Sequence, residues 1–94
     1  MNNDVLNILR QNKALLFSKY PLQSMALFGS QSRGDATDTS DVDILVELNG
    51  AMGFEFLHLN YEIEDLLKRK VDLISRRGLK PQFIQQIEPE LVYV

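Results

Sequence analysis

The sequence predicts an α+β fold with α/β layering, in which a small mixed β-sheet is packed by helices on one side. Segments in which apolar residues have helical spacing alternate with short segments of strand character. This alternation is typical of a layered fold. No internal repeat or low-complexity tract interrupts this order. The chain has 94 residues, 45% of them hydrophobic, which predicts a single domain over residues 1–94 with its own core.

The first predicted helix covers residues 4–19 and precedes a short strand. Asp4 is suited to cap this helix, and its apolar side is formed at roughly helical spacing by Val5, Ile8, Leu9, Leu15 and Leu16. Pro21 ends the helix because proline cannot continue the hydrogen-bond pattern. A strand is expected over residues 24–28, followed by a turn that begins at Gly29.

The clearest strand covers residues 42–48. Its side chains alternate, so that one face carries Val42, Ile44, Val46 and Leu48 and the other carries Asp41, Asp43, Leu45 and Glu47. Asn49 and Gly50 then supply turn chemistry.

The second half of the chain predicts a long helix, two further strands and a short helix. The long helix covers residues 53–70, with a buried stripe formed by Phe56, Leu59, Ile63, Leu66 and Leu67. A second apolar row beside it contains Phe54, Leu57 and Tyr61, which fits either core or a partner surface. Strands are expected over 71–75 and 91–94, and a helix begun by its proline over 81–87.

Composition excludes several classes of protein. The chain has no cysteine, so neither a disulfide framework nor a thiolate metal site is available. No signal peptide or membrane-spanning run is visible, so we expect a soluble cytoplasmic protein without membrane contact. A net charge of −3 disfavours direct nucleic-acid binding. Six of ten basic residues nevertheless fall within residues 68–80. This stretch fits either a solvated helix end or an electropositive rim that binds phosphates or an acidic partner.

Three aspartates occupy positions where a strand would favour apolar residues. Asp41 and Asp43 begin the best strand two positions apart, on one face and roughly 6–7 Å from each other. Asp72 repeats the pattern between Val71 and Leu73. If the two strands are neighbours, three carboxylates converge, and such an oxygen ligand set suits Mg²⁺ or Mn²⁺ with phosphate and water. Each aspartate alone could equally be a turn or cap residue.

A glycine–serine pair follows the apolar strand that precedes these acids. Gly29 lets the backbone approach a phosphate closely, and the start of a following helix would offer free N–H donors. The Ser30 hydroxyl adds a donor, and Arg33 lies one helical turn further on, where it could neutralise phosphate oxygens. Alone, the pair is as well explained by a turn and an N-cap.

The combined spacing resembles a known family. Gly29-Ser30, ten residues, then Asp41-Val42-Asp43 matches the GS-x10-DxD signature of the DNA polymerase beta-type nucleotidyltransferase superfamily, and within it the minimal nucleotidyltransferases, or MNT domains. The resemblance runs from about Met25 to Val94 and includes Lys70 to Ile74 and Leu91 to Tyr93. Ser32 stands where the family commonly has alanine. The resemblance implies the nucleotidyltransferase fold.

The resemblance also implies roles. Gly29, Ser30 and Arg33 would hold the triphosphate of ATP, and Asp41, Asp43 and Asp72 would hold two Mg²⁺ ions. Asp72 would also help to deprotonate the acceptor hydroxyl. Family members of this size are typically antitoxins that pair with a HEPN-domain ribonuclease toxin and place AMP on one of its tyrosines.

Three hypotheses follow. The first is a Mg²⁺- and ATP-dependent enzyme that moves AMP to a protein hydroxyl of a cognate HEPN toxin and forms a hetero-oligomer with it. The second is a non-catalytic antitoxin that neutralises its partner by covering it with the wide apolar helix. The third is nucleotidyl transfer to a small molecule, for which the related enzymes generally carry an extra helical domain.

Overall fold

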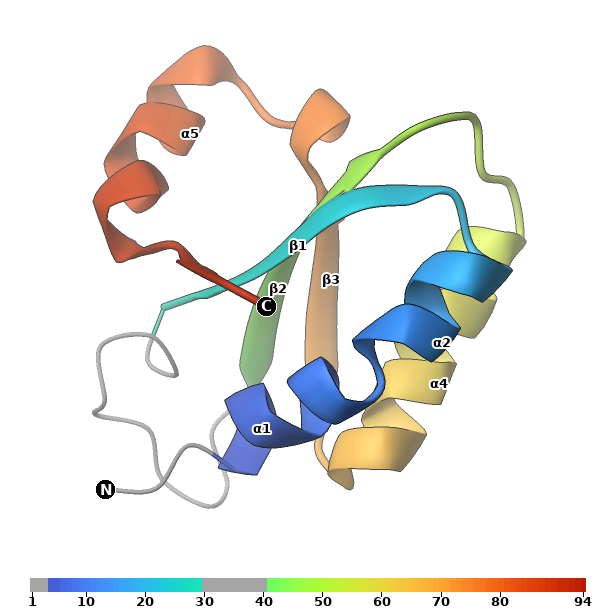
Figure 1. The fold of residues 1–94 in the computed structure, drawn as a ribbon. Coiled ribbons are helices and arrows are strands. Elements are labelled where there is room, and N and C mark those ends of the chain that lie inside the picture. The colour runs from blue at the N-terminus through green and yellow to red at the C-terminus, as the bar shows by residue number, and fades with distance from the viewer. Residues whose placement is uncertain (1–3, 30–40) are drawn as a thin grey trace.

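The computed structural model describes residues 4–29 and 41–94, which form a four-stranded sheet with helices packed against it (Figure 1). In these residues the elements are α1 (Asp4–Gln11), α2 (Lys13–Lys19), β1 (Leu22–Phe28), β2 (Val42–Leu48), α4 (Glu55–Leu67), β3 (Val71–Ser75), the 3-10 turn η1 (Arg76–Gly78), α5 (Pro81–Ile87), the 3-10 turn η2 (Glu88–Glu90) and β4 (Val92–Tyr93). The strand order is β3-β2-β1-β4; β2 is parallel to β3, and the other two pairs are antiparallel. The predicted mixed sheet and α+β class are confirmed.

The main core lies between the sheet and the helices α1, α2 and α4. Ile44 and Val46 of β2 are fully buried, as the alternation of this strand predicts. They belong to one apolar cluster with Leu59 and Ile63 of α4, and Leu9 of α1 joins it. Figure 1 shows these three helices together on one side of the sheet, as the sequence predicts for the helices, whereas α5 packs on the other face and departs from that prediction.

The opposite face of the sheet carries a smaller apolar cluster. Ile87 at the end of α5 packs there against Phe28 of β1 and Leu45 of β2. In Figure 1, α5 lies away from the three other helices, at the upper left. Helix α5 therefore covers part of the acidic face of β2. The beginning of β2, near Asp43, contributes to the site described below.

The N-terminal segment predicted as one helix consists of two helices that meet at Asn12. The backbone of Asn12 departs from helical geometry, with φ −104° and ψ 4°, and its Nδ2 donates a hydrogen bond to the Ile8 carbonyl at 2.8 Å. Asparagine side chains compete for helix carbonyls in this way and disfavour a continuous helix. Beyond the break Leu16 is buried, whereas Leu15, predicted on the apolar side, is 51% exposed.

The other element boundaries agree with the predictions to within a few residues. The ranges of β2, β3 and α5 are those predicted, whereas β1 begins two residues earlier and β4 is only two residues long. Helix α4 is shorter than predicted at both ends. It ends because Lys68 adopts a left-handed conformation with φ 56°, which a continuing helix does not allow.

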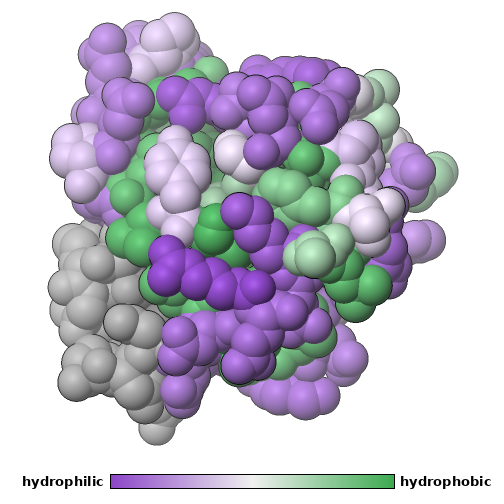
Figure 2. Space-filling model, viewed as in Figure 1, coloured by the Kyte–Doolittle hydropathy of each residue, from purple (hydrophilic) through white to green (hydrophobic). Residues whose placement is uncertain are grey.

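The second apolar row on α4 is exposed. Phe54 is 86% exposed, Tyr61 56% and Leu57 48%. On the face drawn in Figure 2, hydrophobic residues are interspersed with hydrophilic ones. No helix within residues 4–29 and 41–94 combines the length and the apolar character that crossing a membrane requires.

Candidate active site

Two of the predicted acids face each other across neighbouring strands. Strands β2 and β3 are parallel, and Asp43 is paired in register with Asp72. In-register residues of parallel neighbours point to the same face, and their backbones lie about 4.8 Å apart. Both side chains therefore project from the face of the sheet that is opposite the main core, which agrees with the alternation in the sequence. Asp41 directly precedes β2 and is exposed, two residues before Asp43.

Two hydrogen bonds place the starts of β2 and β3 side by side. The Val42 N–H donates to the Lys70 carbonyl at 3.0 Å, so the strands pair from their first residues. The Val71 N–H donates to Glu64 Oε2 at 2.9 Å, which joins the last turn of α4 to β3. Because Val71 is buried, its neighbour Asp72 is forced to the exposed face.

Gly29 brings the end of β1 next to Asp43. The antiparallel register pairs Phe28 with Asp43, so Gly29 leaves the sheet beside that aspartate. Its φ of 74° lies in the left-handed region that glycine adopts without strain. A methyl group on the Gly29 Cα would lie 2.5 Å from Asp43 Oδ2, closer than atoms can approach. Glycine is therefore required here both by conformation and by space.

The segment that leads into β4 contributes a residue that the sequence analysis did not select. The Gly29 N–H donates to Glu90 Oε1 at 3.0 Å, across 61 residues of sequence. Glu90 ends η2, just before β4. In the sequence it is one of several acids in the second half of the chain, and no spacing rule relates it to Gly29.

The residues present fit a divalent cation by their chemistry. Asp43 and Asp72 present carboxylate oxygens on one face of adjacent strands, and hard oxygen ligands of this type suit Mg²⁺. In the part of the chain described, no three Asp, Glu, His or Cys side chains are already gathered closely enough to hold a metal ion. The arrangement therefore supplies aligned ligands that would close around a cation and its phosphates.

Two predicted site residues and the basic stretch complete the comparison with the sequence. Ser30 and Arg33 lie outside the described residues. Of the basic stretch, Lys68 forms an exposed ion pair with Asp65 at 3.4 Å, and Arg76 approaches Glu88 at 3.8 Å. These two contacts agree with a solvated helix end and an exposed turn.

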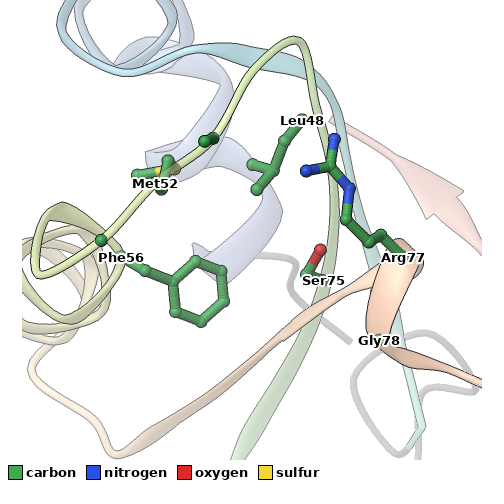
Figure 3. Close-up of a pocket in the computed structure, with 8 residues that line it drawn as sticks. Leu48, Met52, Phe56, Ser75, Arg77 and Gly78 are labelled. Carbon is green, nitrogen blue, oxygen red and sulfur yellow. The ribbon is translucent and has the colours of Figure 1, made fainter.

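A pocket of about 490 Å³ lies at the other end of the parallel strands (Figure 3). Leu48, Phe56 and Ser75 contribute to its wall, and Arg77 reaches over it from η1. Because Ser75 and Leu48 alternate with the acids along their strands, they belong to the core face. The pocket is therefore distinct from the acidic site.

Comparison with known proteins identifies the family to which the chain belongs. The sequence pattern of the family described as "Nucleotidyltransferase domain" matches residues 8–94. The protein adenylyltransferase MntA of Thermococcus cleftensis is 34% identical over 92 residues, which cover 97% of this chain and 93% of that protein. A Methanocaldococcus jannaschii protein, named as a candidate protein adenylyltransferase, is 41% identical over 96 residues, 98% of this chain and 96% of its own.

Solved structures agree with the fold. One described as a candidate minimal nucleotidyltransferase matches with a TM-score of 0.84 at 30% identity, over 100% of this chain and 97% of the other. A toxin–antitoxin structure with AMP-PNP matches with a TM-score of 0.71 at 26% identity, over 99% of this chain and 72% of the other. The family match and the shared fold agree with the paired aspartates beside Gly29. The chain therefore belongs to the nucleotidyltransferase family and has the fold of a minimal nucleotidyltransferase.

Proposed function

We propose that this protein transfers AMP from ATP to a hydroxyl group of a partner protein and acts as the antitoxin of that partner. The observation that carries the proposal is the pairing of Asp43 with Asp72 directly beside Gly29. The similarity to protein adenylyltransferase MntA supports a protein acceptor. The similarity to a toxin–antitoxin structure with AMP-PNP supports both the nucleotide and the toxin partner.

The proposed roles are those that the family resemblance implies for the matching residues. Gly29, with Ser30 and Arg33, would hold the triphosphate, and Asp41, Asp43 and Asp72 would hold two Mg²⁺ ions. When bound, the ions supply positive charge that stabilises the entering and leaving oxygens of an in-line displacement. The acceptor oxygen attacks the α-phosphorus while the bond to the β-phosphate bridge breaks and pyrophosphate leaves. Asp72 would help to remove the proton of the acceptor.

The proposed acceptor is a tyrosine of a HEPN-domain ribonuclease, as the family resemblance implies. AMP on such a tyrosine would add bulk and a negative charge to the toxin and silence it. The proposal also implies a hetero-oligomer of antitoxin and toxin. Because ATP and the RNA substrate of a ribonuclease occur in the cytosol, the proposal places the protein there.

The proposal is tested by incubating the purified protein with α-phosphorus-labelled ATP, Mg²⁺ and the product of the neighbouring gene, which the proposal expects to be a HEPN-domain ribonuclease. Label should move to the partner with wild type. Asp43→Asn or Asp72→Asn should lower the rate by about 100-fold or more, because each removes a carboxylate that would hold the Mg²⁺ ions, and with it their stabilisation of the reacting phosphate. Asp65→Asn is the matched control, since Asp65 is exposed on α4 and pairs only weakly with Lys68.

Absence of transfer by wild type, or equal rates for Asp43→Asn and Asp65→Asn, contradicts the enzyme proposal. Substitution of the acceptor tyrosine by phenylalanine should abolish labelling. Mass spectrometry of the labelled partner then identifies the residue that carries AMP.

A second function is favoured by the exposed row on α4. Phe54, Leu57 and Tyr61 remain accessible in this chain, and exposed apolar groups of this kind often mark partner surfaces. The protein would then neutralise the toxin by binding alone. In that case Asp43→Asn still suppresses the ribonuclease, whereas Phe54→Asp with Tyr61→Asp does not.

A further inference from the structure

Four neighbouring segments contribute one residue each to a single row at the same end of the sheet. Asp72 of β3 is paired with Asp43 of β2. Gly29 directly follows β1 and lies next to Asp43. Glu90, which precedes β4, lies on the other side of Gly29. The first three residues belong to the proposed nucleotide site, and Glu90 completes the row.

The register of β1 and β4 explains why Glu90 reaches Gly29. Ala26 is paired with Tyr93 and Leu27 with Val92. Continuing this antiparallel register by two residues places Gly29 opposite Glu90. At that rung the Gly29 N–H donates to the Glu90 side-chain oxygen at 3.0 Å. The carboxylate thus extends a ladder in which β4 has only two residues.

Gly29 is held between two carboxylates from neighbouring segments. Asp43 Oδ2 lies against its Cα on the β2 side, and Glu90 accepts its N–H on the β4 side. A shift of Gly29 would therefore change the space beside the Asp43 carboxylate.

The C-terminal segment that carries Glu90 is itself anchored. Arg10 of α1 donates to the Tyr93 carbonyl at 2.8 Å, and Lys13 of α2 donates to the Val94 carbonyl at 3.0 Å. The Val94 N–H donates to the Met25 carbonyl of β1 at 2.9 Å. Figure 1 shows this segment returning from α5 alongside β1 to the C-terminus. Glu90 is therefore presented to Gly29 from a fixed support.

From this geometry we infer that Glu90 is a positioning residue of the nucleotide site, which holds Gly29 so that its turn receives the triphosphate. The inference rests on the proposed nucleotide-transfer function and adds a residue to it. The role requires a hydrogen-bond acceptor at the correct reach. A charge role would instead require only a negative group at this place, and a carboxylate near phosphates would by itself weaken nucleotide binding.

The test uses three substitutions that separate reach from charge. Glu90→Gln keeps an acceptor oxygen at full length without the charge. Glu90→Asp keeps the charge but is one methylene shorter, and Glu90→Ala removes both. Glu88→Ala is the control, because Glu88 belongs to the same 3-10 turn and approaches Arg76 instead.

The first measurement is the Gly29 amide in a ¹H–¹⁵N spectrum of each protein, with hydrogen exchange. In wild type, Glu90→Gln and Glu88→Ala we expect a protected amide, whereas Glu90→Asp and Glu90→Ala should exchange at least about tenfold faster because the acceptor is out of reach. Thermal melting identifies any variant that fails to fold. If Glu90→Ala does not fold, reach and charge are separated by comparing Glu90→Gln with Glu90→Asp.

The second measurement is the Kd for α,β-methylene ATP with Mg²⁺, an analogue that cannot release pyrophosphate. We expect about tenfold weaker binding in Glu90→Asp and Glu90→Ala, and a change below about threefold in Glu90→Gln and Glu88→Ala. Unchanged or tighter binding in Glu90→Ala, with wild type binding normally, overturns the positioning role alone. Failure of wild type to bind the analogue removes the proposed function, and this role with it.

Discussion

Gly29 has the least freedom to change of the described residues around the site. Its left-handed backbone and its contact with Asp43 Oδ2 each exclude a side chain. Alanine in this conformation costs about 1–2 kcal/mol, and its methyl group must also displace the aspartate. The two constraints act on the same residue, so a single substitution reports on both backbone and site.

We therefore predict that Gly29→Ala lowers nucleotide transfer by about 100-fold, because a displacement near 1 Å at a reacting group can cost that much. The unfolding free energy should fall by about 1–2 kcal/mol. Transfer assays and urea titrations measure the two effects. Gly78→Ala is the control, since a methyl group on the Gly78 Cα would meet no atom within 4 Å; equal transfer rates for the two variants would show that the contact with Asp43 is unimportant.

At the scale of elements, a polar cluster joins α2 to α4. Lys19 Nζ donates to both oxygens of Glu62, at 2.9 and 2.8 Å, and the Tyr20 hydroxyl donates to Glu62 Oε1 at 2.7 Å. The hydrogen bonds from Lys19 and then Tyr20 lower the pKa of Glu62. Burial, followed by the bond to Glu62, raises the pKa of Tyr20 to about 12. Both shifts favour the protonation states that make these bonds.

The sign of each shift determines the pH dependence of this contact. Because the folded state lowers the Glu62 pKa, its contribution is present above the unfolded value of about 4.3 and is lost as the pH falls through the folded value. Because the folded state raises the Tyr20 pKa, its contribution is present below about pH 10 and is lost as the pH rises towards 12.

We predict that Glu62→Gln lowers the unfolding free energy at pH 7 by up to about 1 kcal/mol, a small value because Lys19 is half exposed and solvent screens the pair. The difference from wild type should begin to shrink near the unfolded value of about 4.3 and disappear as the pH falls through the lowered pKa of Glu62. Urea titrations between pH 3 and 8 measure it. Asp65→Asn is the control for an exposed pair on the same helix; a difference that persists undiminished at pH 3 contradicts the assignment to Glu62 ionisation.

At the scale of the whole molecule, α4 serves two surfaces. One side packs on the sheet through Leu59, Ile63 and Leu67, while Phe54 and Tyr61 remain exposed. Stability and partner binding should therefore respond to different residues of one helix. A pair of neighbouring substitutions separates them.

We predict that Ile63→Ala lowers the unfolding free energy by about 2–5 kcal/mol, because it leaves a cavity at a fully buried position. Tyr61→Ala should change it by less than about 0.5 kcal/mol, as expected of an exposed side chain. Denaturant titration of the free protein measures both. A large loss in Tyr61→Ala would mean that this row supports the fold.

Much of this fold could be predicted because its evidence is local. The alternation in residues 42–48 and the spacing of Leu59, Ile63 and Leu67 each follow from the repeat of one element, and the burial agrees with both. The break at Asn12 was missed because a side-chain bond to Ile8 overrides the helical spacing around it. Propensity alone does not contain that competition.

By itself the sequence determined the faces of β2 and β3, and hence that Asp43 and Asp72 point away from the core, because alternation needs no partner. Only the tertiary structure decided that these strands are parallel neighbours in register and that Glu90 reaches Gly29. The physical reason is that strand pairing depends on contacts between residues distant in the chain, here 61 apart for Gly29 and Glu90. The periodicity of side chains within one strand does not indicate which strands become neighbours.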